Sequence, residues 1–478
     1  MNLRAVSLLY NLLLPPGILL TSPAYLAKMF RRGNYGRDFF QRFGLYSPAA
    51  RARLRGTTRP VWVQAVSVGE VLVALKFIQA LRQAHPGLPV ILSCTTSTAH
   101  ELALTRCQDL CEVLYHPLDL PWAVASAFSL LQPGLLVLVE AELWPNLLVH
   151  ARRNAVPVVL VNARLSPRSE RRYRTFAPLT RPLFGELTRV LVQTPDDATR
   201  WAALGIPPER ISCPGSIKYD QSAQPVPEAM ITRFRELLDA LRGSATGPVV
   251  LAGSTHPGEE KLIGRAFLKL RDRLPDAFLI AVPRHFERGE AVRRDLRDLG
   301  LDPVLKTELD AAPASLPPPS AGRCLVVNTT GELWAWYHLA ALVLIGKSFL
   351  SDEGQNPIEP ILAGTPVVAG PELKNFASLA ARLDAAGGWA RIQNPAELPE
   401  IMAGLLENPE RAAAIVAAGR RVVEQDQGAA ARTVAALAPY LAATGNDKDR
   451  FFPCTRPPND EVSSPQRESR TVSNDPFV

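Results

Sequence analysis

The sequence predicts an α/β protein with two parallel-sheet domains. From residue 60 onward, short apolar runs alternate with longer amphipathic runs, a pattern typical of parallel strands joined by helices. The alternation stops at a polar, proline-bearing stretch, residues 220–227, and then restarts. The 478 residues are 47% hydrophobic and 21% charged, which excludes a disordered, collagen-like or polytopic membrane protein and suits two or three globular domains.

Strands of the first domain are expected at 60–67, 89–94, 113–115, 135–139, 157–161, 189–193 and 211–213. Those of the second are expected at 248–252, 278–282, 324–327, 341–345 and 366–368, after a helix near 227–241. Residues 409–442 are rich in alanine and arginine and are expected to be helical. The expected divisions are an N-terminal segment 1–30, domains 31–224 and 225–445, and a polar, disordered tail 446–478.

Positive charge is concentrated at the N-terminus. Residues 1–60 hold ten Lys or Arg side chains and one acid, Asp38, whereas the whole chain carries a formal charge of +7. The rest of the chain is therefore close to neutral. This distribution excludes a general nucleic-acid surface and favours a contact between the N-terminus and an anionic membrane.

The first basic residues enclose an apolar segment. Val6 to Leu20 is almost continuously apolar, interrupted by Asn11 and the pair at 15–16, and extension to Ala27 gives just enough length to cross roughly 30 Å of hydrocarbon. The cations follow the segment, unlike those of a signal peptide, and this order leaves the rest of the chain in the cytoplasm. A spanning helix, an interfacial helix and a buried helix of a soluble protein all remain open.

Cysteine and histidine spacing indicates no metal site. The six cysteines are scattered and include no Cys-x-x-Cys pair, and the seven histidines lack metal-ligand spacing. Free thiols in a reducing compartment are the simplest interpretation.

The first domain offers two candidate residues at strand ends, where parallel sheets bind ligands. Glu70 ends a Ser-Val-Gly-Glu motif in which Gly69 would permit a tight turn, and its carboxylate could take a proton from a hydroxyl. A helix-capping role for Glu70 is the alternative. Arg164, after a later strand, could bind an anion or be an ordinary surface arginine.

Polar motifs follow four strands of the second domain. Each alone is weak evidence, but together they predict a site for a phosphate-bearing ligand. The first motif precedes an acidic pair at a helix start, and the last could bind ribose hydroxyls through its glutamate. The residues are Ser254, Thr255 and His256; Pro283 and Arg284; Thr330, Gly331 and Glu332; and Asn356, Pro357, Ile358 and Glu359.

These motifs occur in an order that resembles the 3-deoxy-D-manno-octulosonic acid (Kdo) transferases, over about residues 5–443. The shared motifs include Ser-Val-Gly-Glu, Glu-Leu-Trp-Pro-Asn, Asn-Ala-Arg-Leu-Ser, Ser-Thr-His-x-Gly-Glu-Glu, Pro-Arg-His and Asn-Pro-Ile-Glu-Pro. The resemblance implies a GT-B glycosyltransferase with two Rossmann-like domains facing across a cleft and an N-terminal helix anchored on the cytoplasmic side of the inner membrane. The implied reaction moves Kdo from CMP-Kdo to the lipid A precursor, lipid IVA, with inversion and without a cofactor or metal.

The resemblance also implies residue roles. Glu70 corresponds to the catalytic base, and domain 31–224 to the acceptor domain. The motifs containing Arg284, Glu332 and Glu359 correspond to CMP-binding segments. Donor or acceptor contacts are implied for Arg164, Lys218, Ser254, Thr255 and His256. A UDP-sugar enzyme of the same fold, either an N-acetylglucosaminyl transferase or an epimerase, is the alternative.

The chain departs from the family pattern near the expected donor site. Lys347 stands within a turn that is Gly-Gly-Ser in relatives, and Glu353 and Gln355 stand where relatives have Gly and His. Lys347 could add positive charge near the sugar carboxylate, and Gln355 puts a histidine-specific donor contact in question.

Overall fold

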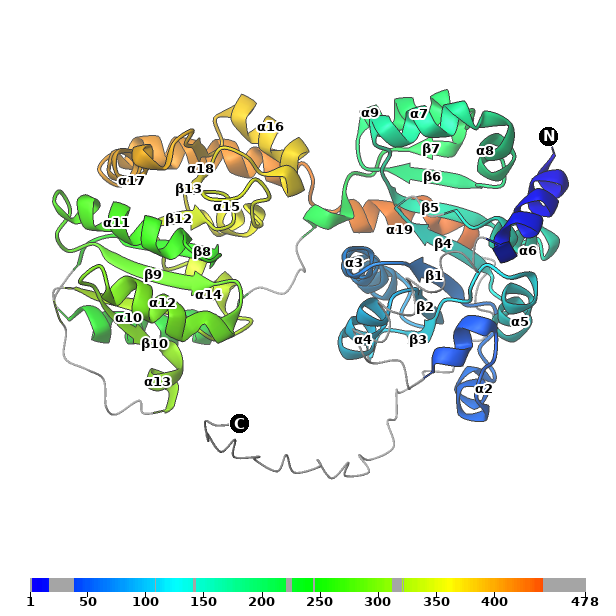
Figure 1. Ribbon diagram of the computed structural model, residues 1–478, viewed down its shortest axis with the longest axis horizontal. Coiled ribbons are helices and arrows are strands. Elements are labelled where there is room, and N and C mark those ends of the chain that lie inside the picture. Colours follow the sequence, from blue (N-terminus) through cyan, green and yellow to red (C-terminus); the bar gives the residue numbers. More distant parts are fainter. Residues whose placement is uncertain are drawn as a thin grey trace, which may run out of the picture. The chain divides into compact units, whose positions relative to one another are not determined.

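The computed structural model describes residues 2–16, 38–107, 109–140, 143–220, 226–243, 246–311, 320 and 322–441 (Figure 1). Contacts divide the chain into a first unit, Met1–Gly215 with Ala430–Val478, and a second unit, Ser216–Ala429. This division differs from the expected one, because it falls at Gly215 and assigns most of the last helix to the first unit. The expected tail, 446–478, lies outside the described residues.

The first unit contains a seven-stranded parallel sheet in the order β3-β2-β1-β4-β5-β6-β7. Its strands are β1 (Val61–Ala65), β2 (Val90–Cys94), β3 (Glu112–Tyr115), β4 (Leu135–Val139), β5 (Val158–Ala163), β6 (Arg189–Val192) and β7 (Ile211–Ser212). Its helices are η1 (Phe39–Phe43), α2 (Pro48–Leu54), α3 (Val68–Ala84), α4 (Ser97–Arg106), α5 (Pro121–Leu131), α6 (Pro145–Arg153), α7 (Pro167–Thr175), α8 (Ala177–Phe184), α9 (Pro195–Ala203), η2 (Pro208–Arg210) and α19 (Ala429–Leu441).

The second unit repeats this plan with the order β10-β11-β9-β8-β12-β13-β14, again parallel. Its strands are β8 (Val249–Thr255), β9 (Phe278–Pro283), β10 (Asp302–Leu305), β11 (Arg323–Val326), β12 (Leu342–Ile345), β13 (Val367–Ala369) and β14 (Ala390–Arg391). Its helices are η3 (Ile217–Tyr219), α10 (Glu228–Arg242), α11 (Glu259–Arg271), η4 (Phe286–Arg288), α12 (Gly289–Arg297), α13 (Lys306–Ala311), α14 (Leu333–Tyr337), α15 (Ile358–Ala363), η5 (Lys374–Phe376), α16 (Ala377–Ala386), η6 (Pro395–Glu397), α17 (Leu398–Leu406) and α18 (Pro409–Glu424).

Helices bury both faces of each sheet, which explains the continuous apolar strands. In the first unit, every residue of β1, β2, β4 and β5 is buried. In the second, one core cluster contains Leu251 and Trp336, and a separate cluster on the other side of the sheet contains Val250 and Phe267. The predicted α/β class with two parallel sheets is confirmed.

The structure adds two strands that the sequence analysis did not predict. β10 includes Asp302 and Pro303 and lies at one edge of its sheet, and β14 is two residues long at the other edge. The helical stretch predicted at 409–442 is two helices, because the chain turns at Gly428, whose φ is +78°.

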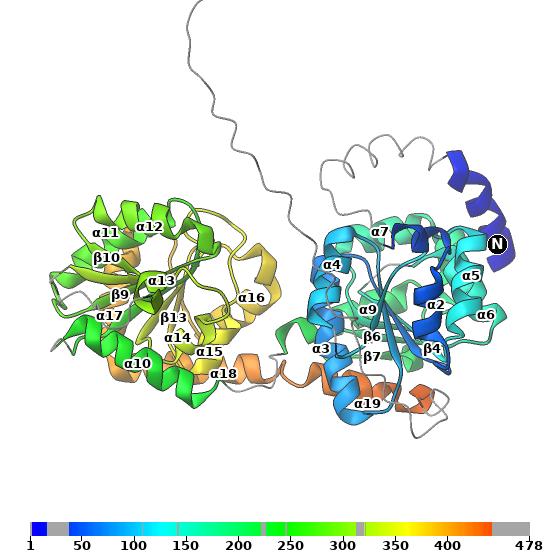
Figure 2. The same ribbon diagram turned by 90° about the horizontal axis from the view of Figure 1, so that it is seen from below.

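Residues 3–16 form a helix that lies beside α6 in both views (Figures 1 and 2). Its Asn11 side chain exchanges hydrogen bonds with that of Asn146, the second residue of α6, at 2.9 and 2.8 Å. No helix in the described part of the chain is both long and apolar enough to span a membrane. The rest of the predicted anchor, from residue 17 to 30, lies outside the described residues, so the membrane-anchor helix is not confirmed.

Candidate functional site

The first strand of each unit lies where the strand order reverses. β1 pairs with β2 on one side and β4 on the other, and β8 pairs with β9 and β12. In open parallel sheets, ligands bind beyond the carboxyl ends of the strands at such a reversal. Glu70 lies shortly after β1, in the first turn of α3, and the predicted triplet 254–256 covers the last two residues of β8 and the residue after them.

Glu70 lies in the first turn of α3 and is 8% exposed. Its carboxylate accepts hydrogen bonds from the Val66 N–H at 2.8 Å and the Ser67 hydroxyl at 2.9 Å. The Ser67 oxygen in turn caps the helix by accepting from the Glu70 N–H at 3.4 Å. Glu70 therefore has the local geometry of a helix cap, and these bonds also hold its carboxylate in one orientation at the ligand-binding edge.

The prediction that Gly69 serves a tight turn is wrong. Gly69 is the second residue of α3, and it is not among the positive-φ glycines. Among the described residues, a β-carbon at this position would have one neighbour within 4 Å, the Ser67 Oγ at 3.9 Å. The backbone therefore does not require glycine at position 69. The absence of a side chain there leaves open space at the start of α3, next to Glu70.

A buried polar group supports the strands next to Glu70. The His116 Nδ1 lies 2.9 Å from the Ser93 hydroxyl, which accepts from the Trp62 indole N–H at 2.8 Å. Burial, with Arg42 nearby, lowers the pKa of His116 to about 3, so its imidazole is neutral at physiological pH. This histidine is part of the framework rather than a proton-transfer group.

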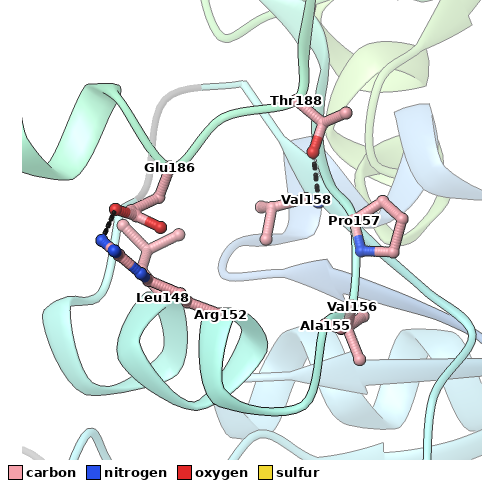
Figure 3. A pocket seen from close by; sticks show the side chains of 8 residues that line it. All are labelled: Leu148, Arg152, Ala155, Val156, Pro157, Val158, Glu186 and Thr188. Atoms are coloured by element: carbon pink, nitrogen blue, oxygen red, sulfur yellow. Dashed lines mark hydrogen bonds and ion pairs between the residues drawn. The ribbon is translucent and has the colours of Figure 1, made fainter.

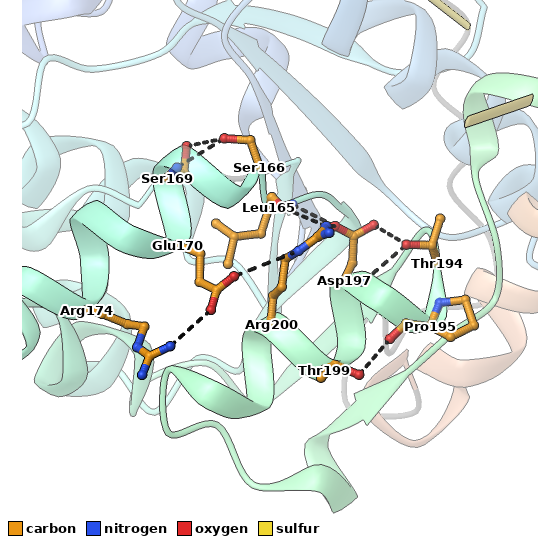
Figure 4. Close-up of polar contacts among 10 residues, drawn as sticks. All are labelled: Leu165, Ser166, Ser169, Glu170, Arg174, Thr194, Pro195, Asp197, Thr199 and Arg200. Carbon is orange, nitrogen blue, oxygen red and sulfur yellow. Dashed lines mark hydrogen bonds and ion pairs between the residues drawn. The ribbon is translucent and has the colours of Figure 1, made fainter. Parts of the chain in front are cut away.

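Arg164 follows β5 and is exposed, with no side-chain hydrogen bond or ion pair to the described residues. The next residue fixes its loop, because the Leu165 N–H donates to Asp197 at 2.9 Å and the Leu165 carbonyl accepts from Arg200 at 3.2 Å (Figure 4). Asp197 also accepts from the Thr194 hydroxyl at 2.7 Å at the start of α9. The loop thus presents a guanidinium on a fixed backbone, as an anion contact requires.

In the second unit, Glu259 ties the loop after β8 to the loop after β12. Its carboxylate is 1% exposed and accepts four main-chain N–H groups. One carboxylate oxygen accepts from the N–H groups of His256 at 2.9 Å and Lys347 at 2.7 Å. The other accepts from those of Ser348 and Phe349, both at 3.1 Å. The sequence predicts a phosphate-bearing ligand near His256, but the His256 N–H already donates to the Glu259 carboxylate and is not open to a phosphate.

Glu260 ties the loop after β9 to the same place. Its two oxygens accept a bidentate pair from Arg288 at 2.8 and 3.1 Å, and one also accepts from the Thr255 hydroxyl at 2.8 Å. Glu259 and Glu260 position the loops around them and do not meet solvent, because each is only 1% exposed. The sequence analysis treated Glu259 and Glu260 as ordinary helix-start acids. The sequence offers no signal for this role, because two adjacent acids at a helix start can both lie on the solvent-facing side of the helix.

The motifs after β9 and β11 differ in whether their charged side chains already have hydrogen-bond or ion-pair partners. Pro283 is buried at the end of β9, whereas Arg284 is exposed and makes no side-chain hydrogen bond or ion pair with the described residues. After β11, Thr330 and Gly331 are exposed, but Glu332 lies 3.2 Å from the Lys306 ammonium and accepts from the Thr329 hydroxyl at 2.5 Å. Arg284 is thus available for an anion, whereas Glu332 organises its own turn.

The Asn356–Glu359 motif forms the start of α15. The Asn356 side chain accepts from the Ile358 N–H at 3.0 Å and donates to Glu359 at 3.1 Å, next to the buried Pro357. Burial, with Glu359 nearby, raises the pKa of the Tyr337 phenol well above its ordinary value. The motif therefore positions a partly buried carboxylate against a neutral tyrosine.

The departures from the family pattern contact one another and the β8 loop. The Lys347 ammonium forms an ion pair with Glu353, and Lys347 adopts a φ of +57°, a conformation in which glycine is unstrained. The Gln355 amide lies 3.2 Å from the His256 Nε2. Burial, then Lys347, lowers the pKa of His256, with Glu259 opposing. Gln355 therefore has a hydrogen-bond partner within the predicted site.

The structure brings the predicted residues of the second unit to one edge of its sheet, except for Lys218. Ser254, whose φ is +55°, marks a break in the register of β8 against β9. Its carbonyl lies so close to Gly346 that a β-carbon there would approach within 2.3 Å. Lys218 lies in η3, where its ammonium donates to the Asn375 carbonyl at 3.1 Å and lies 4.8 Å from the Phe376 ring centre.

A cavity of about 310 Å³ in the first unit is not part of this site (Figure 3). Its wall includes Pro157 and Val158 at the amino end of β5, with Arg152 and Glu186 paired at 2.9 Å across it. Ligands of parallel sheets bind at the opposite, carboxyl edge. The strand-end loops, rather than this cavity, are the candidate site.

The chain is similar in sequence to one family of known proteins. A family model described as "3-Deoxy-D-manno-octulosonic-acid transferase (kdotransferase)" matches residues 37–221. The chain is 33% identical over 412 residues to the 3-deoxy-D-manno-octulosonic acid transferase of Bordetella pertussis, covering 84% of this chain and 91% of the relative. It is 29% identical over 408 residues to that of Haemophilus influenzae, covering 85% and 92%. A glycosyltransferase structure from Rickettsia africae is similar with a TM-score of 0.51 at 12% identity, covering 81% of this chain and 98% of that one.

The structural likeness agrees with the two seven-stranded parallel sheets and confirms the predicted GT-B fold. The sequence likeness extends over both units of the chain. The chain therefore belongs to the 3-deoxy-D-manno-octulosonic acid (Kdo) transferase family: it is a glycosyltransferase, with Kdo transfer in lipopolysaccharide synthesis as its reaction.

Proposed function

We propose that this enzyme transfers Kdo from CMP-Kdo to lipid IVA, with inversion and with Glu70 as the general base. The observation that carries the proposal is the position of Glu70 at the point where the strand order of the first sheet reverses. Its carboxylate is held there by hydrogen bonds from the Val66 N–H and the Ser67 hydroxyl. Family membership supplies the Kdo group that is transferred. CMP-Kdo as donor and lipid IVA as acceptor are the parts of the proposal that an assay must establish.

In this reaction the acceptor hydroxyl oxygen bonds to the anomeric carbon of Kdo. The bond from that carbon to the phosphate oxygen breaks, and CMP departs with the electron pair. The hydroxyl proton passes to Glu70. Hydrogen bonds from the Val66 N–H and the Ser67 hydroxyl fix the direction of the carboxylate before the acceptor arrives.

The second unit supplies groups suited to a CMP-linked acid sugar. The donor carries a phosphate and a carboxylate, and the exposed Arg284 guanidinium can form paired hydrogen bonds with either. Glu359, oriented by Asn356, can accept hydrogen bonds from ribose hydroxyls. Ser254 and Thr255 end β8 and His256 follows them, where Glu259 and Glu260 accept hydrogen bonds from His256 and Thr255, and we assign this segment to the donor.

We expect transfer to need no bound metal. The exposed Arg284 guanidinium can offset the charge that develops on the departing CMP phosphate. Within the described ranges, no group of three or more His, Cys, Asp or Glu side chains has metal-site geometry. Full activity in EDTA is the expected result, and activity restored only by added Mg²⁺ would contradict it.

We place the enzyme on the cytoplasmic face of the inner membrane, because its proposed acceptor carries acyl chains and stays in the bilayer. The cation-rich residues 1–60 support this location. Deleting residues 1–28 should move the protein from the membrane fraction to the soluble fraction. Unchanged membrane association would transfer the role to the cations between residues 31 and 59.

The test of the proposed reaction is a product mass. Purified enzyme is incubated with lipid IVA and either CMP-Kdo or UDP-N-acetylglucosamine, and the lipid is analysed by mass spectrometry. A product heavier by one or more Kdo units, formed only with CMP-Kdo, is the expected result. A product formed only with the UDP-sugar would contradict the proposal in favour of the alternative donor class.

A further inference from the structure

One buried charge of the second unit has no part in the proposed reaction. Lys306, the first residue of α13, is 1% exposed. Lysine is almost never buried to this extent unless it is paired, because removing its charge from water costs free energy. Its ammonium lies 2.6 Å from the Asp310 carboxylate and 3.2 Å from that of Glu332. These two carboxylates therefore offset the cost of burying the lysine.

The two carboxylates connect the ammonium to different parts of the unit. Asp310 lies four residues further along α13, so this pair is local to one helix. Glu332 lies in the turn between β11 and α14. One Glu332 oxygen faces Lys306, and the other accepts from the Thr329 hydroxyl at 2.5 Å. Through Glu332, the lysine therefore holds the turn that carries one of the predicted donor motifs.

Contacts on both sides of this pair hold the same two segments together. Thr307, next to Lys306, donates its N–H to the Asn328 side chain at 3.1 Å and accepts from the amide of that side chain at 2.8 Å. The Lys306 ammonium also lies 5.1 Å from the centre of the Phe234 ring, a distance at which a cation and an aromatic ring attract. Phe234 stacks on Trp336 of α14, with ring centres 4.4 Å apart. The turn is therefore fixed where it begins and where it runs into α14.

The middle of the turn is open, in contrast to its two ends. Thr330 and Gly331 are exposed, and a β-carbon built on Gly331 would have no neighbour within 4 Å among the described residues. A loop that already has its binding conformation before the ligand arrives binds more tightly, because less conformational entropy is lost. Lys306 is too buried to touch a ligand at this turn, so its influence on a ligand has to pass through Glu332.

We propose that Lys306 is a positioning residue for the nucleotide part of the donor. Its ammonium holds Glu332, and Glu332 keeps the Thr330–Gly331 turn in the conformation that cytidine monophosphate (CMP) meets. Without the ammonium, the Glu332 carboxylate can turn to solvent, since 21% of this side chain is already exposed, and the turn loses one of its fixed ends. The inference rests on the proposed function for the identity of the donor, CMP-Kdo.

The test is calorimetric titration of the purified full chain with CMP alone. Lys306→Met keeps an unbranched side chain and removes its charge, and it should bind CMP about tenfold more weakly than the wild type. Asp310→Asn is the matched control, because it removes the local partner of the ammonium and leaves Glu332 in place. This control should bind CMP like the wild type. Equal CMP affinity in Lys306→Met and the wild type would overturn the inference.

The wild-type titration separates this inference from the proposed function. A wild type that binds CMP supports the proposed donor even where Lys306→Met binds it equally well, and only the role of Lys306 is then lost. A wild type that binds no CMP would overturn the proposed donor and the role of Lys306 together. In steady-state transfer, Lys306→Met should raise the KM for CMP-Kdo and leave kcat close to that of the wild type. A lower kcat with an unchanged KM would contradict a positioning role.

A second comparison separates an effect through Glu332 from a general loss of stability. Glu332→Gln removes the carboxylate from the same contact and should itself weaken CMP binding. In that background, adding Lys306→Met should change CMP affinity by less than about twofold, because the contact is already lost. A further loss as large as that in the wild-type background would overturn the inference. Unchanged CMP affinity in Glu332→Gln would also overturn it, even where Lys306→Met does not fold.

Discussion

The two units place a buried glutamate after equivalent strands and use it differently. Glu70 follows β1 and accepts hydrogen bonds from its own turn, at Val66 and Ser67. Glu259 follows β8 and accepts four main-chain N–H groups, three of them from residues 347–349, far along the sequence. Glu70 retains 8% exposure and Glu259 1%.

This difference shows that a glutamate at the same topological position can be oriented toward a substrate or can hold loops of the fold together. A carboxylate whose oxygens are shared among four main-chain amides holds loops together and has little room to bind a substrate. A carboxylate bonded within its own turn at the ligand-binding edge can be oriented and still meet a substrate. The first unit is thus expected to lose activity, and the second to lose organisation, when the respective glutamate is changed.

The largest effect is expected from Glu70→Gln. The amide keeps the size and an acceptor oxygen but cannot take a proton, so kcat should fall by roughly 10²–10⁴-fold. CMP-Kdo binding, measured by calorimetry, should be unchanged because the donor groups lie in the second unit. A Glu70→Gln enzyme at full rate would show that the carboxylate only caps α3.

Glu259→Gln should affect the second unit instead. The new NH₂ group faces main-chain N–H donors, and a buried donor left without an acceptor costs about 1–3 kcal/mol. Thermal unfolding of the second unit should move to lower temperature, with weaker CMP-Kdo binding. Glu287→Gln, at an exposed residue of η4, is the control and should change neither. Normal stability together with weak donor binding would instead make Glu259 a direct ligand group.

Asp119 extends the comparison to pH, because it is another buried carboxylate and it accepts main-chain N–H groups at the start of α6. Burial raises its pKa from 3.8 to about 7, against the opposing N–H groups of Asn146 and Leu147 and the Tyr10 hydroxyl. Between these values the folded protein holds a proton that the unfolded chain has lost. The unfolding free energy of the first unit therefore falls as pH rises through this window, by at most ~1.4 kcal/mol per pH unit.

Urea unfolding of wild type and Asp119→Asn between pH 5 and 8 checks this sign. The difference in unfolding free energy between the two proteins should shift toward the variant as pH rises, since asparagine does not titrate. A difference that is constant across the range would contradict the raised pKa.

Variants of Lys347 and Glu353 test whether the charge of this pair changes the affinity of the second unit for the anionic donor. Lys347→Gly removes the ammonium and relaxes the positive φ, so the donor KM should rise severalfold without a loss of stability. Glu353→Gln releases the ammonium from its ion pair and should lower the donor KM. Steady-state kinetics at low ionic strength measures both. Changes in the same direction would show that the pair acts only within its loop.

Gly69→Ala should have the smallest effect. A β-carbon at this position meets little, and alanine favours the helix by about 1 kcal/mol. The variant should be slightly more stable and turn over normally if the space beside Glu70 is unused. A higher KM for lipid IVA with unchanged donor KM would indicate instead that the acceptor occupies that space.

The fold was predictable because fully buried parallel strands read as continuous apolar runs. β4, with five buried residues at Leu135–Val139, shows this clearly. β10 and β14 were missed because edge strands need no such run, and β10 includes Asp302 and Pro303. Strand ends were therefore located well enough to predict where the site residues gather.

The roles within the site were less predictable, because they depend on contacts between distant residues. Glu259 reads as a helix-start acid, and only the arrival of Lys347 and its neighbours shows that it ties two loops. For the N-terminal leucines, the sequence left a spanning, an interfacial and a buried helix open. Their outward direction is set by Asp119 and Asn146, more than 100 residues along the chain.

The pH dependence of single-turnover transfer at saturating CMP-Kdo tests the central claim, that Glu70 is the base, most directly. The wild-type rate should fall tenfold per unit at low pH, as the carboxylate becomes protonated. Glu70→Gln should give a low rate without this limb. The same limb at an undiminished rate in Glu70→Gln would contradict the claim and assign proton transfer to another group.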